Sequence, residues 1–185
     1  MILVVGVPGA GKTFFARQFA VTYGAPIVSE DRVRYTLFAN HTYKQDENVM
    51  VAQVSSLITE QLFTAGKTFI IDGGYNSETS RTEIAKIAAK REFRTLVVWV
   101  QTDMATAKQR AIRRNPKIVG DRYMQSLTTE QFDAMAKRFT RPRASDNVVV
   151  VSGKHNYSAQ ARVVLNKLAA GGAEPNQSKR SVFIR

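Results

Sequence analysis

The segment Gly6–Thr13, with the sequence GVPGAGKT, matches the phosphate-binding pattern G-x-x-x-x-G-K-[ST], known as Walker A. Glycines allow backbone N–H groups to curl round a phosphate, and the helix that follows such a loop points its amino end at the same anion. The pattern predicts that Lys12 reaches the β- and γ-phosphates of ATP and that the Thr13 hydroxyl binds Mg²⁺. We expect ATP to contact the loop residues Gly6, Pro8, Gly9, Ala10, Gly11, Lys12 and Thr13.

Asp31 and Arg34 lie in the segment Ser29–Arg34 (SEDRVR), which follows a second apolar run. Phosphoryl transfer to a hydroxyl group needs a carboxylate that positions the nucleophile and takes its proton, and a cation that holds the acceptor. Both residues would lie on one helical turn, so Asp31 and Arg34 are candidates for these two roles. The alternative is that Ser29 or Asp31 caps the helix and that Arg34 is solvated.

A further acidic candidate, Asp72, ends the apolar segment Thr68–Asp72 and is followed by the sequence GGYN. A carboxylate at the end of a strand could hold Mg²⁺ directly or through water. The two glycines, Gly73 and Gly74, indicate close approach of the backbone to a ligand. Tyr75 either stacks on a base or packs in the core, and the core is favoured.

Two arginines, Arg110 and Arg114, belong to the most basic cluster of the chain. Because they are four residues apart, we expect them to share one face of a helix. Two guanidinium groups on one face could stabilise the negative charge of a phosphoryl group during its transfer. The alternative is a solvated cationic face. Arg113 is expected to point elsewhere, and a small lid is expected at about residues 108–127.

Apolar, β-branched segments alternate five times with segments that have helical periodicity, which predicts a parallel sheet covered by helices on both faces. The expected fold class is therefore α/β, a three-layer sandwich of the P-loop NTPase type that resembles nucleotide kinases. Ligands bind such sheets at the carboxyl ends of the strands, where Asp31 and Asp72 lie. The strands are expected at residues 2–5, 26–29, 68–72, 95–100 and 147–151.

Several helices have recognisable ends. Asp103 should cap a helix that runs to Arg114. Thr128 and Gln131 have the spacing of a capping box at the start of another helix. The last helix is expected at residues 158–170.

The length of 185 residues suits one domain. We expect that domain to cover residues 1–170, followed by a basic, disordered tail at 171–185. The chain has no cysteine, which excludes disulfides, a thiolate zinc site and a cysteine nucleophile. Since no apolar run reaches the roughly 18 residues that span a bilayer, we expect a cytoplasmic protein without a membrane span.

The chain carries 27 Lys and Arg against 15 Asp and Glu, a formal charge of +12. Residues 86–143 alone have 14 basic and 5 acidic side chains, a net charge of +9, whereas residues 1–85 are close to neutral. Such an excess favours a polyanionic partner such as nucleic acid. The alternative is that the charge serves solubility.

The ordered set of motifs resembles the kinase domain of phage-type polynucleotide 5′-kinases and the wider family of P-loop kinases related to them, including zeta-toxin-like kinases. The resemblance covers about residues 1–152. It implies that Asp31 is the general base toward the acceptor hydroxyl, that Arg34 contacts the acceptor's phosphate, and that Arg110 and Arg114 are lid arginines. The family tends to have an Asp-Thr-Asn type sequence after the third strand, so the alignment of Asn76 stays open.

Together these observations predict an ATP-dependent kinase that moves the γ-phosphate of ATP to a hydroxyl group. The first acceptor hypothesis is the 5′-OH of a polynucleotide, DNA or RNA. A second hypothesis keeps the chemistry but takes a small molecule or a sugar nucleotide, as zeta-toxin-like kinases do. A third is a nucleic-acid-binding ATPase without kinase activity. The sequence predicts no oligomeric state.

Overall fold

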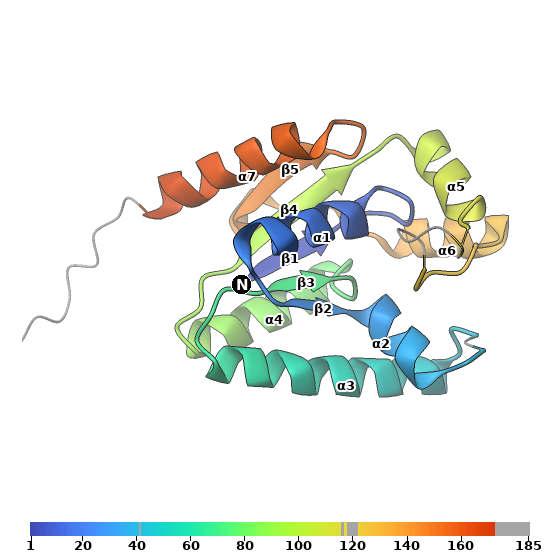
Figure 1. The fold of residues 1–185 in the computed structure, drawn as a ribbon, viewed down its shortest axis with the longest axis horizontal. Coiled ribbons are helices and arrows are strands. Elements are labelled where there is room, and N and C mark those ends of the chain that lie inside the picture. Colours follow the sequence, from blue (N-terminus) through green and yellow to red (C-terminus); the bar gives the residue numbers. More distant parts are fainter. Residues whose placement is uncertain (41, 116, 118–121, 173–185) are drawn as a thin grey trace, which may run out of the picture.

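The computed structural model describes residues 1–40, 42–115, 117 and 122–172. Part of the expected lid and the expected tail from residue 173 onward lie outside these residues. The chain forms five parallel strands in the order β2-β3-β1-β4-β5, which confirms the predicted fold class (Figure 1). The strands are β1 (Ile2–Val5), β2 (Ile27–Ser29), β3 (Ile70–Asp72), β4 (Leu96–Gln101) and β5 (Val148–Ser152).

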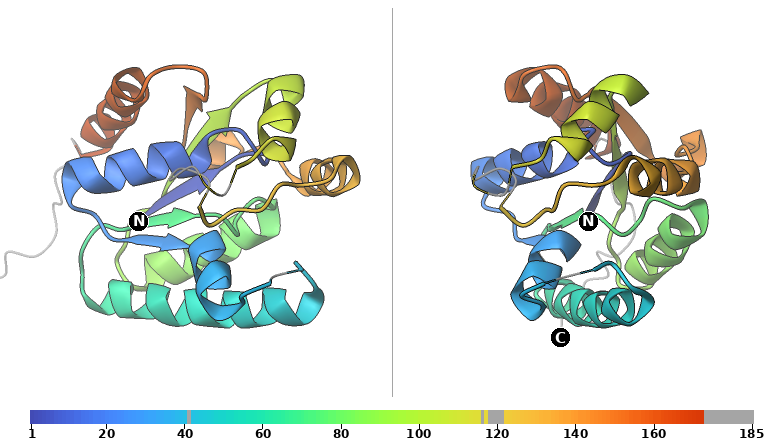
Figure 2. Two further views of the ribbon diagram at one scale, coloured as in Figure 1. Left: turned by 45° about the vertical axis from the view of Figure 1, so that its right-hand side comes forward. Right: turned by 90° about the vertical axis from the view of Figure 1, so that its right-hand side faces the viewer.

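Helices cover both faces of the sheet (Figure 2). The central strand β1 is buried on both sides, as a fully apolar parallel strand should be. Ile2 and Val4 pack in one core with residues of α1 (Lys12–Tyr23) and α7 (Tyr157–Gly172). Leu3 and Val5 pack in the other core, against α3 (Gln45–Thr64) and α4 (Glu78–Lys90).

The remaining helices lie at the carboxyl ends of the strands, where the candidate residues gather (Figure 1). They are α2 (Glu30–Leu37), α5 (Met104–Ile112) and α6 (Thr129–Arg138), and a short 3₁₀ turn, η1 (Ala144–Asp146), precedes β5. The expected capping box is confirmed, because the side chains of Thr128 and Gln131 each bond the other's backbone N–H at the start of α6.

Two predicted helix ends are wrong. Asp103 caps α5 as expected, but α5 ends at Ile112, so Arg114 lies beyond the helix and does not share a helix face with Arg110. The residue before a proline is disfavoured in helical conformation, which stops the helix before Asn115. At the other end of the chain, α7 continues through Gly172, because glycine weakens a helix by only about 1 kcal/mol per residue.

Among the described residues, no helix is both long enough and apolar enough to cross a membrane.

Candidate functional site

The phosphate-binding loop connects β1 to α1 and is held in shape by close packing. Gly9 has φ of 75°, and a Cβ atom there would lie 2.0 Å from the carbonyl oxygen of Ala107 in α5. Gly9 therefore lets α5 rest directly on the loop. The Lys12 ammonium donates a hydrogen bond of 3.0 Å across the loop to the carbonyl of Val7. In this conformation of the loop, Lys12 lines the cavity that opens beside the loop.

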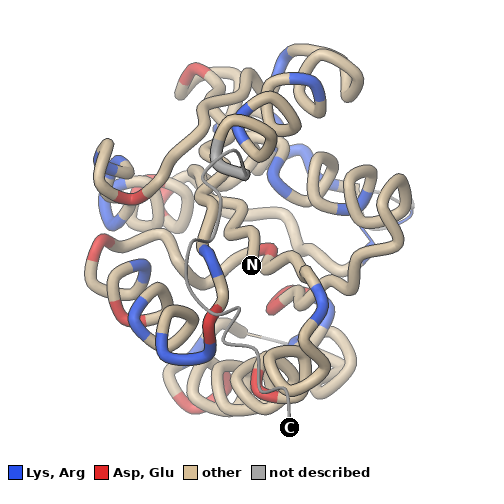
Figure 3. Tube along the Cα trace, turned by 90° about the vertical axis from the view of Figure 1, so that its left-hand side faces the viewer, with Lys and Arg blue, Asp and Glu red and all other residues tan. Residues whose placement is uncertain are grey.

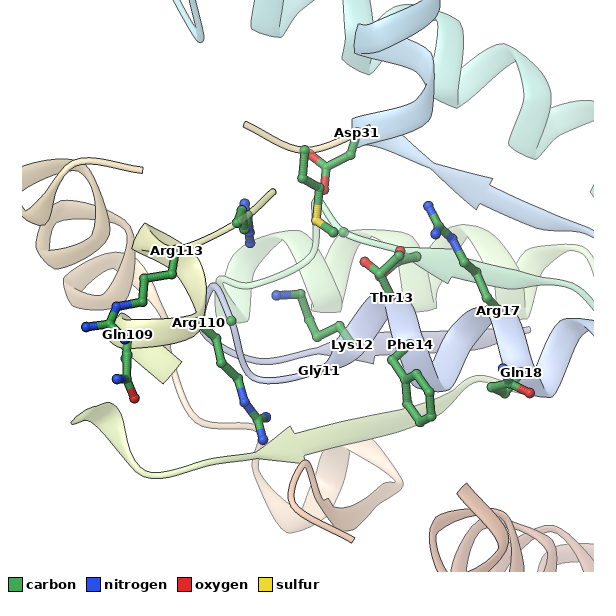
Figure 4. Close-up of a pocket in the computed structure, with 15 residues that line it drawn as sticks. Gly11, Lys12, Thr13, Phe14, Arg17, Gln18, Asp31, Gln109, Arg110 and Arg113 are labelled. Atoms are coloured by element: carbon green, nitrogen blue, oxygen red, sulfur yellow. The ribbon is translucent and has the colours of Figure 1, made fainter. Parts of the chain in front are cut away.

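A cavity of about 750 Å³ opens above the loop at the carboxyl ends of the strands. In Figure 4, Lys12 and Thr13 approach it from the start of α1, and Asp31 approaches it from α2. The structure thus brings the sequence-predicted candidates of three separate segments to one place. We call this space the larger cavity, and its charged lining residues are Lys12, Arg17, Asp31, Asp72, Arg110, Arg113 and Arg114.

Asp72 is the buried carboxylate of the site, with 4% of its surface exposed at the end of β3. Burial raises its pKa to about 6, although a hydrogen bond from the Thr13 hydroxyl and the charge of Lys12 act in the opposite direction. Burial also lowers the pKa of Lys12. A carboxylate and a hydroxyl are the hard oxygen donors that Mg²⁺ prefers, so Thr13 and Asp72 fit the predicted metal site.

No group of three His, Asp or Glu side chains within the described part of the chain could hold a metal ion. A metal at Thr13 and Asp72 would therefore take its other ligands from phosphate oxygens and water, as Mg²⁺ does in nucleotide sites.

Asp31 faces the larger cavity from the first turn of α2. The cap of α2 is Ser29, whose hydroxyl accepts a hydrogen bond of 3.4 Å from the backbone N–H of Arg32. The alternative in which Asp31 caps the helix is therefore wrong. Its carboxylate lies near Lys12 and Asp72, where a reacting hydroxyl group could sit.

Arg34 is buried rather than solvated, which corrects the alternative interpretation of this residue. Its guanidinium group donates hydrogen bonds to Glu47 at 3.4 Å and to Asn48 at 2.7 Å. The ring of Tyr43 stacks over the same group, with its centroid 4.7 Å from Cζ. Protein groups thus bind both Nη atoms of the cation that the resemblance assigned to a phosphate of the acceptor, whereas its Nε atom is buried without a hydrogen-bond partner among the described residues.

Glu47 is a residue that the sequence analysis did not single out. Besides pairing with Arg34, its carboxylate accepts hydrogen bonds of 2.8 and 2.9 Å from the backbone N–H of Thr42 and one of 2.8 Å from that of Tyr43. It therefore holds the turn in which Tyr43 takes a φ of 59°. The sequence signal was only an acidic residue in the first turn of a helix, which is common.

A smaller cavity of about 300 Å³ lies beside the larger one and shares Lys12, Asp31 and Asp72 with it. Gly74 has φ of 79° beside this cavity, and a Cβ atom there would lie 2.1 Å from a carboxylate oxygen of Glu30. The close approach that was expected to be to a ligand is thus, at Gly74, an approach to Glu30, whereas a Cβ atom on Gly73 would lie 3.8 Å from Glu30. The other charged or aromatic lining residues are Arg34, Tyr43, Arg114, Arg138 and Phe139.

The predicted lid arginines both line the larger cavity, although they are not on one helix. Arg110 donates a hydrogen bond of 3.0 Å to the carbonyl of Gly153, and Arg114 donates one of 3.2 Å to the carbonyl of Gln125. Arg113, which was expected to point elsewhere, also lines the larger cavity.

Tyr123, in the expected lid, lies against the helices that carry the candidate residues. Its ring packs edge-on against that of Tyr35 in α2, with centroids 5.2 Å apart. The guanidinium group of Arg17, a residue of α1 that the sequence analysis missed, lies 5.2 Å from the centroid of the same ring. Through Tyr123, the described part of the expected lid therefore contacts both α1 and α2.

Asn76 supports the phosphate-binding loop from the segment after β3. Its side-chain oxygen accepts a hydrogen bond of 3.1 Å from the backbone N–H of Gly6, and its carbonyl accepts one from the buried Arg81 at 3.1 Å. Arg81 also pairs with Asp146 at 3.3 Å. These contacts give Asn76, whose alignment the sequence left open, a structural role in supporting the loop. Residue spacing in the sequence does not predict this role for Asn76 or Arg81. Tyr75 packs against a core, as favoured.

The comparisons with known proteins agree with this architecture. A family model described as AAA domain (AAA_33) matches residues 1–142. No curated protein matches the chain.

Solved structures with a similar fold include three kinases. A sugar kinase from Janibacter sp. HTCC2649 is 14% identical with a TM-score of 0.65, and the match covers 91% of this chain and 93% of that one. A gluconokinase from Sinorhizobium meliloti is 16% identical with a TM-score of 0.65 and 91% of each chain covered. The APS kinase of Mycobacterium tuberculosis, solved with AMPPNP and APS, is 15% identical with a TM-score of 0.63, over 91% of this chain and 96% of that one.

Proposed function

The chain belongs to the AAA domain family AAA_33, and on that premise we propose that it is an ATP-dependent kinase that phosphorylates a hydroxyl group of a small molecule. One observation carries the proposal. Lys12, Asp31 and Asp72, from three segments far apart in the sequence, line the same cavity at the carboxyl edge of the sheet. They are a phosphate-binding cation, a candidate base and a candidate metal ligand, which are the parts that phosphoryl transfer needs.

In the proposed reaction, Lys12 and the loop amides hold the β- and γ-phosphates of ATP. Asp31 orients the acceptor hydroxyl and takes its proton, the hydroxyl oxygen bonds to the γ-phosphorus, and the bond to the β–γ bridging oxygen breaks to release ADP. Mg²⁺ held by Thr13 and Asp72 would neutralise phosphate charge. Arg110 and Arg114 stabilise the charge of the phosphoryl group in transfer.

Two observations favour a small acceptor over a polynucleotide. The smaller cavity, which Asp31 also lines, has a volume of about 300 Å³, which suits a small ligand. The Nη atoms of Arg34, the residue expected to contact an acceptor phosphate, already bond Glu47 and Asn48, and Glu47 balances its charge. The proteins of similar fold include a sugar kinase, a gluconokinase and an APS kinase solved with APS. These names agree with a small-molecule acceptor.

The polynucleotide 5′-OH is the second candidate, and the net charge of +9 in residues 86–143 is what favours it. Along the Cα trace, Lys and Arg are spread over several helices and loops rather than gathered in one segment (Figure 3). Some are neutralised locally, as in the ion pairs Arg91–Glu60, Lys108–Asp133 and Arg143–Glu78. This distribution weakens the case for a long polyanionic substrate.

A screen for transfer of labelled γ-phosphate tests the proposal. The acceptors are sugars, amino sugars, sugar nucleotides and 5′-OH oligonucleotides of DNA and RNA, with ATP and Mg²⁺. We expect a small molecule to be labelled, and we expect Asp31→Asn to slow that transfer by about 10²- to 10⁴-fold while ATP still binds. Asp46→Asn, an exposed acidic residue in the first turn of α3, is the control.

Labelling of oligonucleotides alone would replace the small acceptor with a polynucleotide, whose binding should weaken steeply as salt rises. ATP hydrolysis with no labelled acceptor would favour an ATPase. Undiminished transfer by Asp31→Asn would exclude the assigned base.

A further inference from the structure

Glu30 is a charged residue of the smaller cavity to which the proposed reaction gives no role. It precedes the candidate base Asp31 in α2, and its carboxylate lies against Gly74, where the absence of a side chain leaves room for it. No residue in the described part of the chain donates a hydrogen bond to this carboxylate. Burial raises its pKa, as expected for a carboxyl group that has lost water without gaining a donor. A half-buried acceptor of this kind is usually completed by a ligand or by water.

We propose that Glu30 binds the phosphate acceptor, and that the acceptor is a small molecule that presents a hydroxyl or ammonium group to Glu30 and carries no phosphate or carboxylate at that end. This inference rests on the proposed kinase function and deepens it.

The first relevant feature is Arg34, a cation of the smaller cavity that already has protein partners. Arg34 is the cation nearest to Glu30 in sequence that also lines the smaller cavity, yet its Nη atoms bond Glu47 and Asn48. Its Nε atom is buried and has no partner. Glu47, whose Oε2 atom lies 3.4 Å from Nη1, balances the charge of this guanidinium, so the Arg34–Glu47 pair adds no net charge to the cavity wall.

Three other cations line the smaller cavity, namely Lys12, Arg114 and Arg138. Lys12 belongs to the phosphate-binding loop, and Arg114 bonds the carbonyl of Gln125 at the boundary with the larger cavity. Arg138, from α6, is exposed, so water screens its charge. On the side of the cavity formed by α2 and β3, the carboxylates of Glu30, Asp31 and Asp72 accompany Arg34, whose charge Glu47 balances. A second anion would therefore be repelled there, and a hydrogen-bond donor would be stabilised.

Two residues that line the smaller cavity, Tyr43 and Arg114, both form hydrogen bonds with the backbone of Gln125. The backbone of Gln125 forms a hydrogen bond with the Tyr43 hydroxyl, and its carbonyl accepts one from Arg114. The turn that Glu47 holds and the described part of the expected lid therefore meet beside the smaller cavity. The smaller cavity, with a volume of about 300 Å³, fits a molecule of the size of one sugar.

Three acceptors of nearly equal size test the charge preference, namely glucose, glucosamine and gluconate, together with a panel of other polyols and amino alcohols. Initial rates of γ-phosphate transfer give kcat/KM for each, and a fluorescent ATP analogue measures nucleotide binding separately. The wild type is expected to prefer neutral and cationic acceptors over anionic ones. In Glu30→Gln, kcat/KM for the preferred acceptor should fall about 10- to 100-fold, because a hydrogen bond to a charged group is lost. Affinity for the ATP analogue should stay unchanged.

Glu83→Gln is the matched control, because Glu83 is an exposed residue of α4 away from both cavities. Glu30→Asp keeps the charge one methylene further away and should restore part of the rate, which separates binding by the carboxylate from a folding defect. A preference for gluconate, an unchanged rate in Glu30→Gln, or labelling of no member of the panel would overturn the inference. Failure to bind the ATP analogue would instead overturn the proposed function.

Discussion

Arg34 and Glu47 form an ion pair that joins the last turn of α2 to the first turn of α3. Their nearest charged atoms, Nη1 and Oε2, lie 3.4 Å apart, and the two side chains are 7% and 14% exposed. Because Glu47 also bonds the backbone of Thr42 and Tyr43, the pair fixes the turn that carries the ring of Tyr43 over Arg34. The arginine that sequence patterns assign to the substrate thus holds together the wall of the cavity.

Glu47→Gln should destabilise this wall. The change leaves the buried guanidinium of Arg34 without its counter-charge and weakens the hydrogen bonds to Thr42 and Tyr43. We expect a lower midpoint of urea unfolding than for the control Asp46→Asn, which changes an exposed acidic residue of the same helix turn. Equal midpoints for the two variants would show that the pair does not support the fold.

Asp72 should make stability depend on pH in the absence of metal and nucleotide. Its pKa is raised from 3.8 to about 6 in the folded chain, so the folded state binds a proton more tightly than the unfolded state between these values. This contribution favours folding below about pH 4 and is lost as the pH rises through about 6. The shift corresponds to roughly 3 kcal/mol at 1.36 kcal/mol per unit.

Asp72→Asn should therefore unfold at a higher urea concentration than the wild type at pH 8 in EDTA, with a gain of about 1–3 kcal/mol. The gain should shrink between pH 6 and pH 4, while transfer activity is lost at every pH. A gain that stays constant with pH would mean that ionisation of Asp72 is not its source.

Arg81 should be one of the costliest single residues to replace. It is 2% exposed, and its donors reach Asp146, the carbonyl of Asn76 and the carbonyl of Arg141. Arg81→Met leaves these acceptors and the Asp146 charge unpaired, which should cost about 3–5 kcal/mol of unfolding free energy. Lys86→Met, on an exposed position of the same helix, is the control and should cost far less. The measurement is urea unfolding followed by circular dichroism.

Gly9→Ala should lower stability by more than the cost of a left-handed backbone conformation alone. Gly24 has φ of 61° with nothing near its missing Cβ, so Gly24→Ala reports the cost of a left-handed conformation, about 1–2 kcal/mol. Gly9→Ala adds a clash with the backbone of Ala107. We expect a larger loss of stability together with weaker binding of an ATP analogue, whereas Gly24→Ala leaves binding unchanged. Equal effects of the two substitutions would contradict the close packing of α5 on the loop.

The sequence by itself predicted the features that depend on neighbouring residues. Lys12 and Thr13 are placed by one contiguous loop, and the five strands appear as apolar runs whose positions differ from the observed ones by a few residues at most. The rule that parallel strands end at the same edge of a sheet also brought Asp31 and Asp72 toward that loop.

Only the tertiary structure decided the long-range side-chain contacts. The pairing of Arg34 with Glu47 and the support of Gly6 by Asn76 depend on how helices and loops pack, and nothing in local spacing encodes them. The same holds for the carboxylate of Glu30, which receives no hydrogen bond from the described residues. These contacts determine how much charge and space is left for a substrate. The reaction type therefore follows from short-range pattern, whereas the choice of acceptor follows from which charges the folded protein has already neutralised.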